Sequence, residues 1–271
     1  MTVKIGWVEI AEGVFVRRYP FLDQNIGVVV GETGVLIVDS RASERHAREI
    51  VTDIRVITAR APTVVVNTHA HWDHCFGNRA FRPCAIWGHE GMADFLARTL
   101  EDQRVTTVES APGLAEEMAD FAPDLPDRTV HDAATVDLGG RSVDLRFLGR
   151  GHTDNDIVVV VSGTDVVFAG DLIEGGDPPG FGDGYPIDWP ATDDALLALA
   201  AGQYVPGHGP VFDHAQVAAQ SQEVRQIADL AQRVAEGHLE FEQATLLAPW
   251  PPDIAREPIA RGVGQLRGDL D

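Results

Sequence analysis

The sequence predicts an α+β fold, a four-layer αββα sandwich, on three observations. Short runs rich in Val and Ile occur in two separate parts of the chain, which predicts two β-sheets. Longer segments with helical periodicity flank these runs and predict outer layers of helices. Polar residues able to do chemistry follow several of the apolar runs directly, which places the candidate site at the ends of strands.

In the first half, three apolar runs predict strands at residues 14–16, 26–30 and 35–38. The sequence Gly-Glu-Thr-Gly at 31–34 predicts the hairpin turn between the last two. A helix is expected to begin at Ser43 and to run to about residue 58, because apolar residues recur there every three to four positions.

Residues 63–67 predict another strand, and residues 85–87 a further short one. A helix is expected at 91–100. The next segment, 101–128, is acidic and contains three prolines, so we expect an irregular excursion with one short helix near 114–119.

The second half repeats this style. Apolar runs predict strands at 142–148, 156–162 and 165–169, and a Gly-, Pro- and Asp-rich loop follows at 174–190. Helices are expected at 192–200, capped by Thr192, and at 214–236, with two shorter helices in the tail. We expect residues 1–212 to form the sandwich and 213–271 a helical extension packed on it.

Composition limits the partners. The formal net charge is −21, from 42 acidic residues against 21 Lys and Arg, so we expect no nucleic acid partner. No apolar stretch reaches the ~18 residues of a membrane-spanning helix. Residues 1–10 lack the apolar core of a signal peptide, and two cysteines in so long a chain suit reduced thiols, so we expect a cytoplasmic protein.

The segment His-Ala-His-Trp-Asp-His at 69–74 follows the strand predicted at 63–67. Histidine and aspartate are rarely buried unless they are paired or bind a metal. In an extended chain His69 and His71 project to the same side, while Asp73 and His74 follow after a bend and can face a second point. The spacing therefore predicts two metal ions side by side.

Three further segments place a metal-competent residue at the end of a strand and beside glycine. These residues are His152 in Gly-His-Thr, Asp171 in Ala-Gly-Asp and His208 in Pro-Gly-His-Gly-Pro. Each alone is more often structural than functional. Together with the segment at 69–74 they are too many to be explained by packing, which indicates one shared site.

The ordered set HxHxDH, GHT, AGD and PGHG resembles the metallo-β-lactamase fold superfamily of metallohydrolases, over about residues 14–210. The resemblance implies two Zn²⁺ ions, and iron or manganese would suit the same donors. It implies a first metal held by His69, His71 and His152, a second held by Asp73, His74 and His208, and Asp171 as the bridge.

The resemblance also indicates the branch. The best-known true β-lactamases of this fold carry a cysteine where this chain has Asp171, or lack the bridging acid, and many lack a ligand at the position of His74. The ligand set is more similar to the glyoxalase II and lactonase branches. It implies hydrolysis of an ester, thioester, lactone or amide of a small metabolite by a hydroxide held between the metals, with Asp73 and Asp171 as the catalytic carboxylates.

Three other functions remain open alternatives. Persulfide dioxygenases of the superfamily use one iron held by two histidines and one aspartate. Phosphodiesterases and ribonucleases share HxHxDH, but the acidic composition disfavours them. A true β-lactamase is the third, and it is disfavoured by Asp171.

The sequence gives fewer signals for the residues that contact a substrate. Phe181, Tyr185 and Trp189 in the loop after Asp171 are candidates for the walls of a pocket, with Tyr185 able to donate to an oxyanion. The alternative is that they pin the loop to the body of the protein. Cys75, Trp72 and the remaining histidines, His89, His131 and His214, are expected to be structural. Nothing in the sequence sets the oligomeric state.

Overall fold

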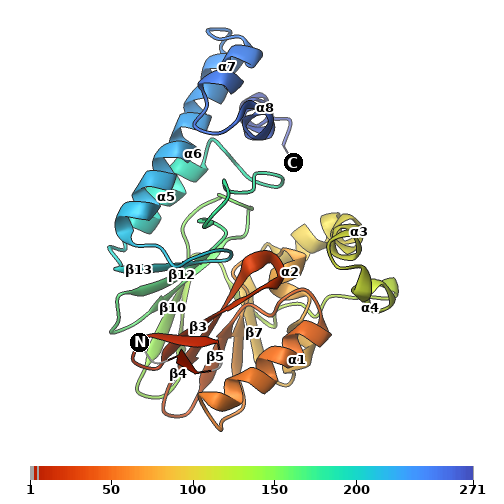
Figure 1. Ribbon diagram of the computed structural model, residues 1–271, viewed down its shortest axis with the longest axis vertical. Coiled ribbons are helices and arrows are strands. Elements are labelled where there is room, and N and C mark those ends of the chain that lie inside the picture. Colours follow the sequence, from red (N-terminus) through yellow and green to blue (C-terminus); the bar gives the residue numbers. More distant parts are fainter. Residues whose placement is uncertain (1–2, 5, 271) are drawn as a thin grey trace.

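The computed structural model describes residues 3–4 and 6–270, which form two β-sheets packed face to face between layers of helices (Figure 1). The predicted four-layer sandwich is confirmed. Residues 1, 2 and 5 of the N-terminal segment, where we expected no signal peptide, lie outside the described residues, as does residue 271. No helix in the described part of the chain is long and apolar enough to cross a membrane.

The first sheet has eight strands in chain order, β1 to β8. Neighbours from β1 to β5 are antiparallel, and those from β5 to β8 are parallel. The strands are β1 Val3–Lys4, β2 Trp7–Ala11, β3 Val14–Tyr19, β4 Gln24–Val30, β5 Val35–Val38, β6 Val64–Val66, β7 Ala85–His89 and β8 Arg128–Val130.

The second sheet has five strands in the order β13-β12-β11-β10-β9. Its pairs are antiparallel except β12 with β13. The strands are β9 Ala133–Asp137, β10 Ser142–Phe147, β11 Ile157–Val161, β12 Val166–Gly170 and β13 Gln203–Pro206.

Helices cover the outer faces (Figure 1). The α-helices are α1 Glu44–Asp53, α2 Trp72–Cys75, α3 Met92–Ser110, α4 Ala115–Ala119, α5 Trp189–Leu197, α6 His214–Ala235, α7 Phe241–Leu247 and α8 Pro252–Arg267. Short 3₁₀ turns lie at Phe21–Asp23, Ile54–Val56, Asn78–Phe81 and Pro112–Leu114.

Alternating side chains build the layers. On β3, Val16 faces the second sheet while Phe15 packs toward α1. On β12, Phe168 faces the first sheet while Val167 packs toward the helices on the other side. Strands buried on both faces are apolar throughout, which is why they are visible in the sequence. Each such side chain stabilises the fold by about 1.5–3 kcal/mol on burial.

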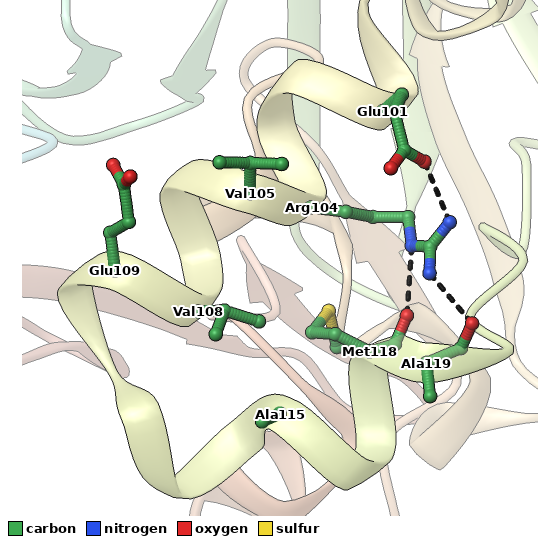
Figure 2. A pocket seen from close by; sticks show the side chains of 8 residues that line it. All are labelled: Glu101, Arg104, Val105, Val108, Glu109, Ala115, Met118 and Ala119. Carbon is green, nitrogen blue, oxygen red and sulfur yellow. Dashed lines mark hydrogen bonds and ion pairs between the residues drawn. The ribbon is translucent and has the colours of Figure 1, made fainter.

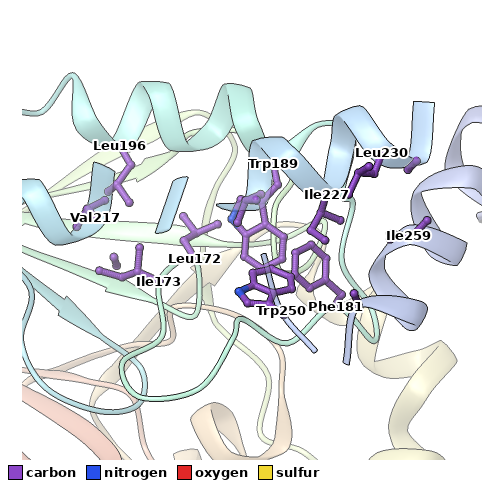
Figure 3. Close-up of a cluster of buried hydrophobic side chains, with 14 of the residues drawn as sticks. Leu172, Ile173, Phe181, Trp189, Leu196, Val217, Ile227, Leu230, Trp250 and Ile259 are labelled. Carbon is purple, nitrogen blue, oxygen red and sulfur yellow. The ribbon is translucent and has the colours of Figure 1, made fainter. Parts of the chain in front are cut away.

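The C-terminal helices share a core with the second sheet. Figure 3 shows Trp189 and Leu196 of α5 packed with Val217 and Ile227 of α6, and Ile259 of α8 lies in the same cluster. A domain boundary at 212/213 remains a prediction, and the helices after it complete the hydrophobic layer of the residues before it.

The sequence missed four strands, β1, β2, β8 and β9. Strands β8 and β9 expose most of their side chains, so they lack the apolar runs that marked the others. The prediction of an irregular segment from residue 101 was also wrong, because α3 continues to Ser110. Gln103 and Thr107 are buried on its inner face, where polar residues hide the helical periodicity.

Arg104 holds α4 against α3. Its guanidinium donates to the carbonyl oxygens of Met118 and Ala119 (Figure 2). The predicted short helix near 114–119 is thereby confirmed as α4.

Helix α5 begins three residues earlier than predicted, at Trp189, with Pro190 in its first turn. Thr192 does not cap the helix. Its hydroxyl instead donates to the carbonyl oxygen of Arg150, which ties the helix to the loop that carries His152.

Candidate metal centre

The predicted ligands lie at neighbouring strand ends. His69 follows β6, and the chain then turns at His71 into α2, which carries Asp73 and His74. The other three, His152, Asp171 and His208, follow β10, β12 and β13. The packing of the two sheets brings all seven side chains into one cluster that could hold metal.

The first donor set is formed by three imidazoles. Nδ1 of His71 lies 3.0 Å from Nε2 of His69 and 2.8 Å from Nε2 of His152. His69 and His152 are almost fully buried, so this set is open mainly on the side of His71.

The second donor set is Asp73, His74 and His208. The Nε2 atoms of the two histidines are 3.2 Å apart. Oδ2 of Asp73 lies 3.3 Å from His74 Nε2 and 3.2 Å from His208 Nε2. The short helix α2 is what turns Asp73 and His74 away from the first set.

Asp171 lies between the two sets. Its Oδ2 is 3.7 Å from Nε2 of both His69 and His152, and 3.4 Å from Nε2 of both His74 and His208. One carboxylate oxygen therefore stands near two members of each set, which is the position of a bridging ligand.

The spacings around Asp171 and Asp73 fit divalent metal ions. Donors bound to one tetrahedral ion at ~2.0–2.2 Å lie roughly 3.3–3.6 Å from one another, and the separations around Asp171 and Asp73 fall close to that range. Oδ1 of Asp171 is buried and accepts no hydrogen bond from the described residues. A buried, unpaired carboxylate oxygen among imidazoles is costly unless a cation compensates it.

The other ring nitrogen of each ligand histidine is held by a fixed partner. This fixes the tautomer and aims the ligating nitrogen at the centre. The pairs are His69 Nδ1 with Thr68 Oγ1, His71 Nε2 with Asp183 Oδ2, His74 Nδ1 with Asp39 Oδ2, His152 Nδ1 with the Gly180 carbonyl, and His208 Nδ1 with the Leu22 carbonyl, at 2.7–3.1 Å.

Sequence reasoning missed these partners. Asp39 follows β5 directly, so the same rule that found the ligands, a carboxylate at the end of an apolar strand, could have found it. It also accepts from the backbone N–H and the hydroxyl of Thr68. The Gly180 and Leu22 partners act through backbone carbonyls and leave no signal in residue type.

Two members of the first set, His69 and His152, are held as neutral imidazole. Burial, followed by the charge of His74, keeps the pKa of His69 well below its usual value. Burial and then His71 lower the pKa of His152 to about 4. Neutral imidazole is the form that binds metal.

The histidines of the second set have raised pKa values because carboxylates lie beside them. Burial opposes protonation of His208, but Asp171, followed by Asp73, raises its pKa to about 11. The pKa of His74 is raised well above its usual value in the same way, against the effect of burial. A cation entering this set replaces protons, so metal binding here should release protons.

Gly207 leaves room for the bridging carboxylate. A Cβ on Gly207 would stand 1.6 Å from Oδ1 of Asp171. Only glycine lets the backbone after β13 approach the carboxylate so closely.

The three predicted substrate contacts lie within the body of the protein. Phe181 and Trp189 are 2% and 0% exposed and belong to the hydrophobic cluster of Figure 3. Tyr185 is 5% exposed, with the guanidinium of Arg150 over its ring. The structure thus shows the loop-pinning role for all three. Direct contact with a substrate stays a prediction.

The residues expected to be structural lie outside both donor sets. Cys75 is buried, and burial raises the pKa of its thiol. His89 stacks on Phe147, and His131 pairs with Glu90 at the surface.

A pocket of about 230 Å³ opens beside the first donor set. His71 and Asp73 line it together with residues of α3. Its lining is His71, Trp72, Asp73, Thr99, Asp102, Gln103, Thr106 and Asp183. We call it the α3 pocket. No sequence signal had pointed to α3 as part of the site.

The whole site falls within residues 19–235, the part of the chain that matches the sequence profile of the metallo-beta-lactamase superfamily. The chain belongs to the metallo-beta-lactamase superfamily. The resemblance inferred from the motifs is thereby confirmed.

Two relatives in this superfamily show the range of named activities. The metallo-beta-lactamase type 2 of Bacillus sp. (strain 170) is 25% identical over 185 residues, which cover 66% of this chain and 64% of that protein. The acyl-coenzyme A thioesterase MBLAC2 of Homo sapiens is 24% identical over 200 residues, covering 66% of this chain and 67% of that protein. The match to the first thus spans less than two thirds of its length.

Solved structures of the superfamily fold agree. The metallo-beta-lactamase from Pontibacter korlensis superposes with a TM-score of 0.65 at 20% identity, over 81% of this chain and 98% of that one. The sec-alkylsulfatase Pisa1 from Pseudomonas sp. gives a TM-score of 0.76 at 13% identity, over 96% of this chain and 50% of that one. These similarities establish the fold alone.

Proposed function

We propose that this protein is a dinuclear metal-dependent hydrolase that cleaves an ester, thioester, lactone or amide of a small metabolite. The observation that carries the proposal is the position of Asp171 Oδ2, 3.4–3.7 Å from two histidines of each donor set. A single-ion site would need only one of these sets, whereas here both are assembled around a shared carboxylate.

We assign the seven residues to two metal ions. His69, His71 and His152 hold one ion, Asp73, His74 and His208 hold the other, and Asp171 sets their separation. Divalent ions held there would polarise a carbonyl group and would lower the pKa of bound water to about 7. Asp73, in the lining of the α3 pocket, is placed to orient the attacking water by accepting its hydrogen bond.

Zinc is the proposed metal, since five imidazoles and two carboxylates are donors that it accepts well. Iron and manganese accept similar sets, so metal analysis decides. Among the proposed substrate classes we favour the thioester, because two similar proteins are named acyl-coenzyme A thioesterase. The size of the α3 pocket, about 230 Å³, suits a small group beside the scissile bond.

A substrate panel tests the proposal. Zinc-loaded protein is assayed with a lactone, a thioester, a phosphodiester and a chromogenic β-lactam, beside His71→Ala and Asp171→Ala. We expect turnover of the thioester or lactone and a loss of at least 100-fold in both variants, because each removes a ligand. His131→Ala is the control, since His131 is exposed, pairs with Glu90 and belongs to neither donor set.

Two results would overturn the proposal. One is turnover of the phosphodiester alone. The other is an Asp171→Ala protein that keeps both metal ions and full activity.

A further inference from the structure

The α3 pocket offers hydrogen-bond acceptors to whatever lies beside the metal centre. Its α3 wall is made by Thr99, Asp102, Gln103 and Thr106, which recur at the three- and four-residue spacing of one helix face. The opposite side of the same helix forms the apolar groove with α4 in Figure 2. The polar face is therefore turned toward the site.

The donors on this wall are already used. The hydroxyl of Thr99 donates to the carbonyl oxygen of Phe95, and that of Thr106 donates to the carbonyl oxygen of Asp102. The amide nitrogen of Gln103 donates to the carbonyl oxygen of Ala70 and to Thr99 Oγ1. What remains on this helix face is oxygen acceptors.

One of these acceptors is buried and unsatisfied. The side chain of Gln103 is 6% exposed, and its Oε1 accepts no hydrogen bond from the described residues. A buried acceptor left without a partner is unfavourable, so a ligand that draws the Gln103 side chain toward the pocket and donates to its Oε1 would relieve it.

Asp102 adds a negative charge with no counter-ion. Its carboxylate makes no hydrogen bond or ion pair with the described residues, and no Lys or Arg lines the pocket. The other acid at the rim, Asp183, is different because His71 Nε2 lies 3.1 Å from it. Asp102 is thus the carboxylate left for a ligand.

We propose that the α3 pocket selects substrates carrying a protonated amine a few atoms from the scissile bond, with Asp102 as the specificity-determining residue. An alkylammonium group both donates hydrogen bonds and neutralises the carboxylate, and the ring of Trp72 suits its methyl groups. The net charge of −21 also concentrates cations near the protein. The inference rests on the proposed hydrolase function and names its substrate class.

Three thioacetates of nearly equal shape test it. Their thiol parts end in dimethylammonium, isopropyl or carboxylate, as the S-[2-(dimethylamino)ethyl], S-(3-methylbutyl) and S-(2-carboxyethyl) esters. With metal-loaded protein at pH 7, we expect kcat/KM to fall in the order cation, neutral, anion. The cation should lead the neutral ester about two- to fivefold, as an exposed charge pair allows.

Variants of equal charge identify the residue. Asp102→Asn should reduce the preference for cation over neutral ester to about one. Glu109→Gln removes the same charge from the same helix, but outside the α3 pocket, and should leave the preference unaltered. An anion cleaved as well as the cation, or equal effects of the two variants, would overturn the inference.

A binding measurement separates this inference from the proposed function. If no thioacetate, lactone or amide is cleaved, the hydrolase proposal fails. Saturation-transfer NMR with N,N-dimethylbutylammonium then tests, independently of catalysis, whether the α3 pocket binds an amine. Binding to the wild type that is lost in Asp102→Asn supports a site for amines, and equal signals from both proteins reject it.

Discussion

Asp171 depends on its immediate surroundings for its position. Burial would raise the pKa of its carboxyl, but His74, His208 and His69 hold that pKa well below the usual value, so the group is a carboxylate. It sits against Gly207, where no side chain fits. The arrangement of single residues around it therefore makes specific predictions.

Gly207→Ala should displace Asp171, because the new methyl group would overlap its Oδ1. We expect the variant to lose at least one metal ion per chain and about 100-fold in activity, while remaining folded. Metal content and circular dichroism check this. Gly163→Ala is a control for the change itself, since a Cβ there meets nothing within 4 Å, although its φ of 76° adds some strain. Full metal content in Gly207→Ala would show that Asp171 does not need its present position.

Asp39→Asn tests the partners behind the ligands. Asn keeps the shape but loses the charge that orients His74. We expect the affinity for the second metal ion to fall about 10- to 100-fold, and that for the first ion to fall less, because Asp39 reaches His69 only through Thr68. Titration calorimetry measures it, with Asp132→Asn at an exposed site as the control. If the wild type, Asp39→Asn and Asp132→Asn bound the second metal ion with equal affinity, Asp39 would not orient His74 for metal binding.

At the scale of elements, the ends of strands carry the chemistry while their interiors carry the core. The candidate ligands, which the structure brings together, could be picked out from the sequence because each follows an apolar run, as Asp171 follows β12. The α3 pocket could not be predicted. Gln103 and Asp102 read as ordinary polar residues in an acidic segment, and only the packing of α3 beside α2 brings them to the site. Exposed strands such as β9 were missed for a related reason. Only burial produces the run of apolar residues by which a strand is recognised in a sequence.

Helix α5 contains a buried acid with a consequence for stability. Asp193 is 2% exposed, and burial raises the pKa of its carboxyl to about 8. Its folded-state pKa therefore exceeds the unfolded one, so the stability it contributes is complete below pH 4 and is lost as pH rises toward 8.

Asp193→Asn, neutral at every pH, should remove this loss. We expect the variant to be more stable than the wild type by about 1–3 kcal/mol above pH 8, and by little at pH 5. Denaturant unfolding at both pH values measures the difference. The neighbouring Asp194, paired with Arg225 at the surface, supplies the control variant Asp194→Asn. If the free energy of unfolding of the wild type rose relative to that of Asp193→Asn as the pH increased, the prediction would be wrong.

For the whole molecule, the metal centre joins the two halves of the sandwich. One half supplies the segment 69–74 after the first sheet, and the other supplies His152, Asp171 and His208 after the strands of the second. Ions bound at this junction bind the folded chain and not the unfolded one, so they stabilise the sandwich as a unit.

Removing the metal should therefore lower the thermal stability of the entire chain. At metal concentrations about a thousand times the dissociation constant, we expect a stabilisation of about 4 kcal/mol and a rise in Tm of roughly 10 °C over the chelated protein. Calorimetry with and without chelator measures it. Asp171→Ala should show a much smaller rise, and an equal rise in that variant would place the metal elsewhere.

The central claim is that one carboxylate joins two metal-binding sets. Anomalous diffraction at the metal edge, from crystals of protein loaded with zinc, tests it most directly. We expect two peaks per chain, one bonded by His69, His71 and His152, the other by Asp73, His74 and His208, with Asp171 between them. A single peak, or two peaks that Asp171 does not contact, would contradict it.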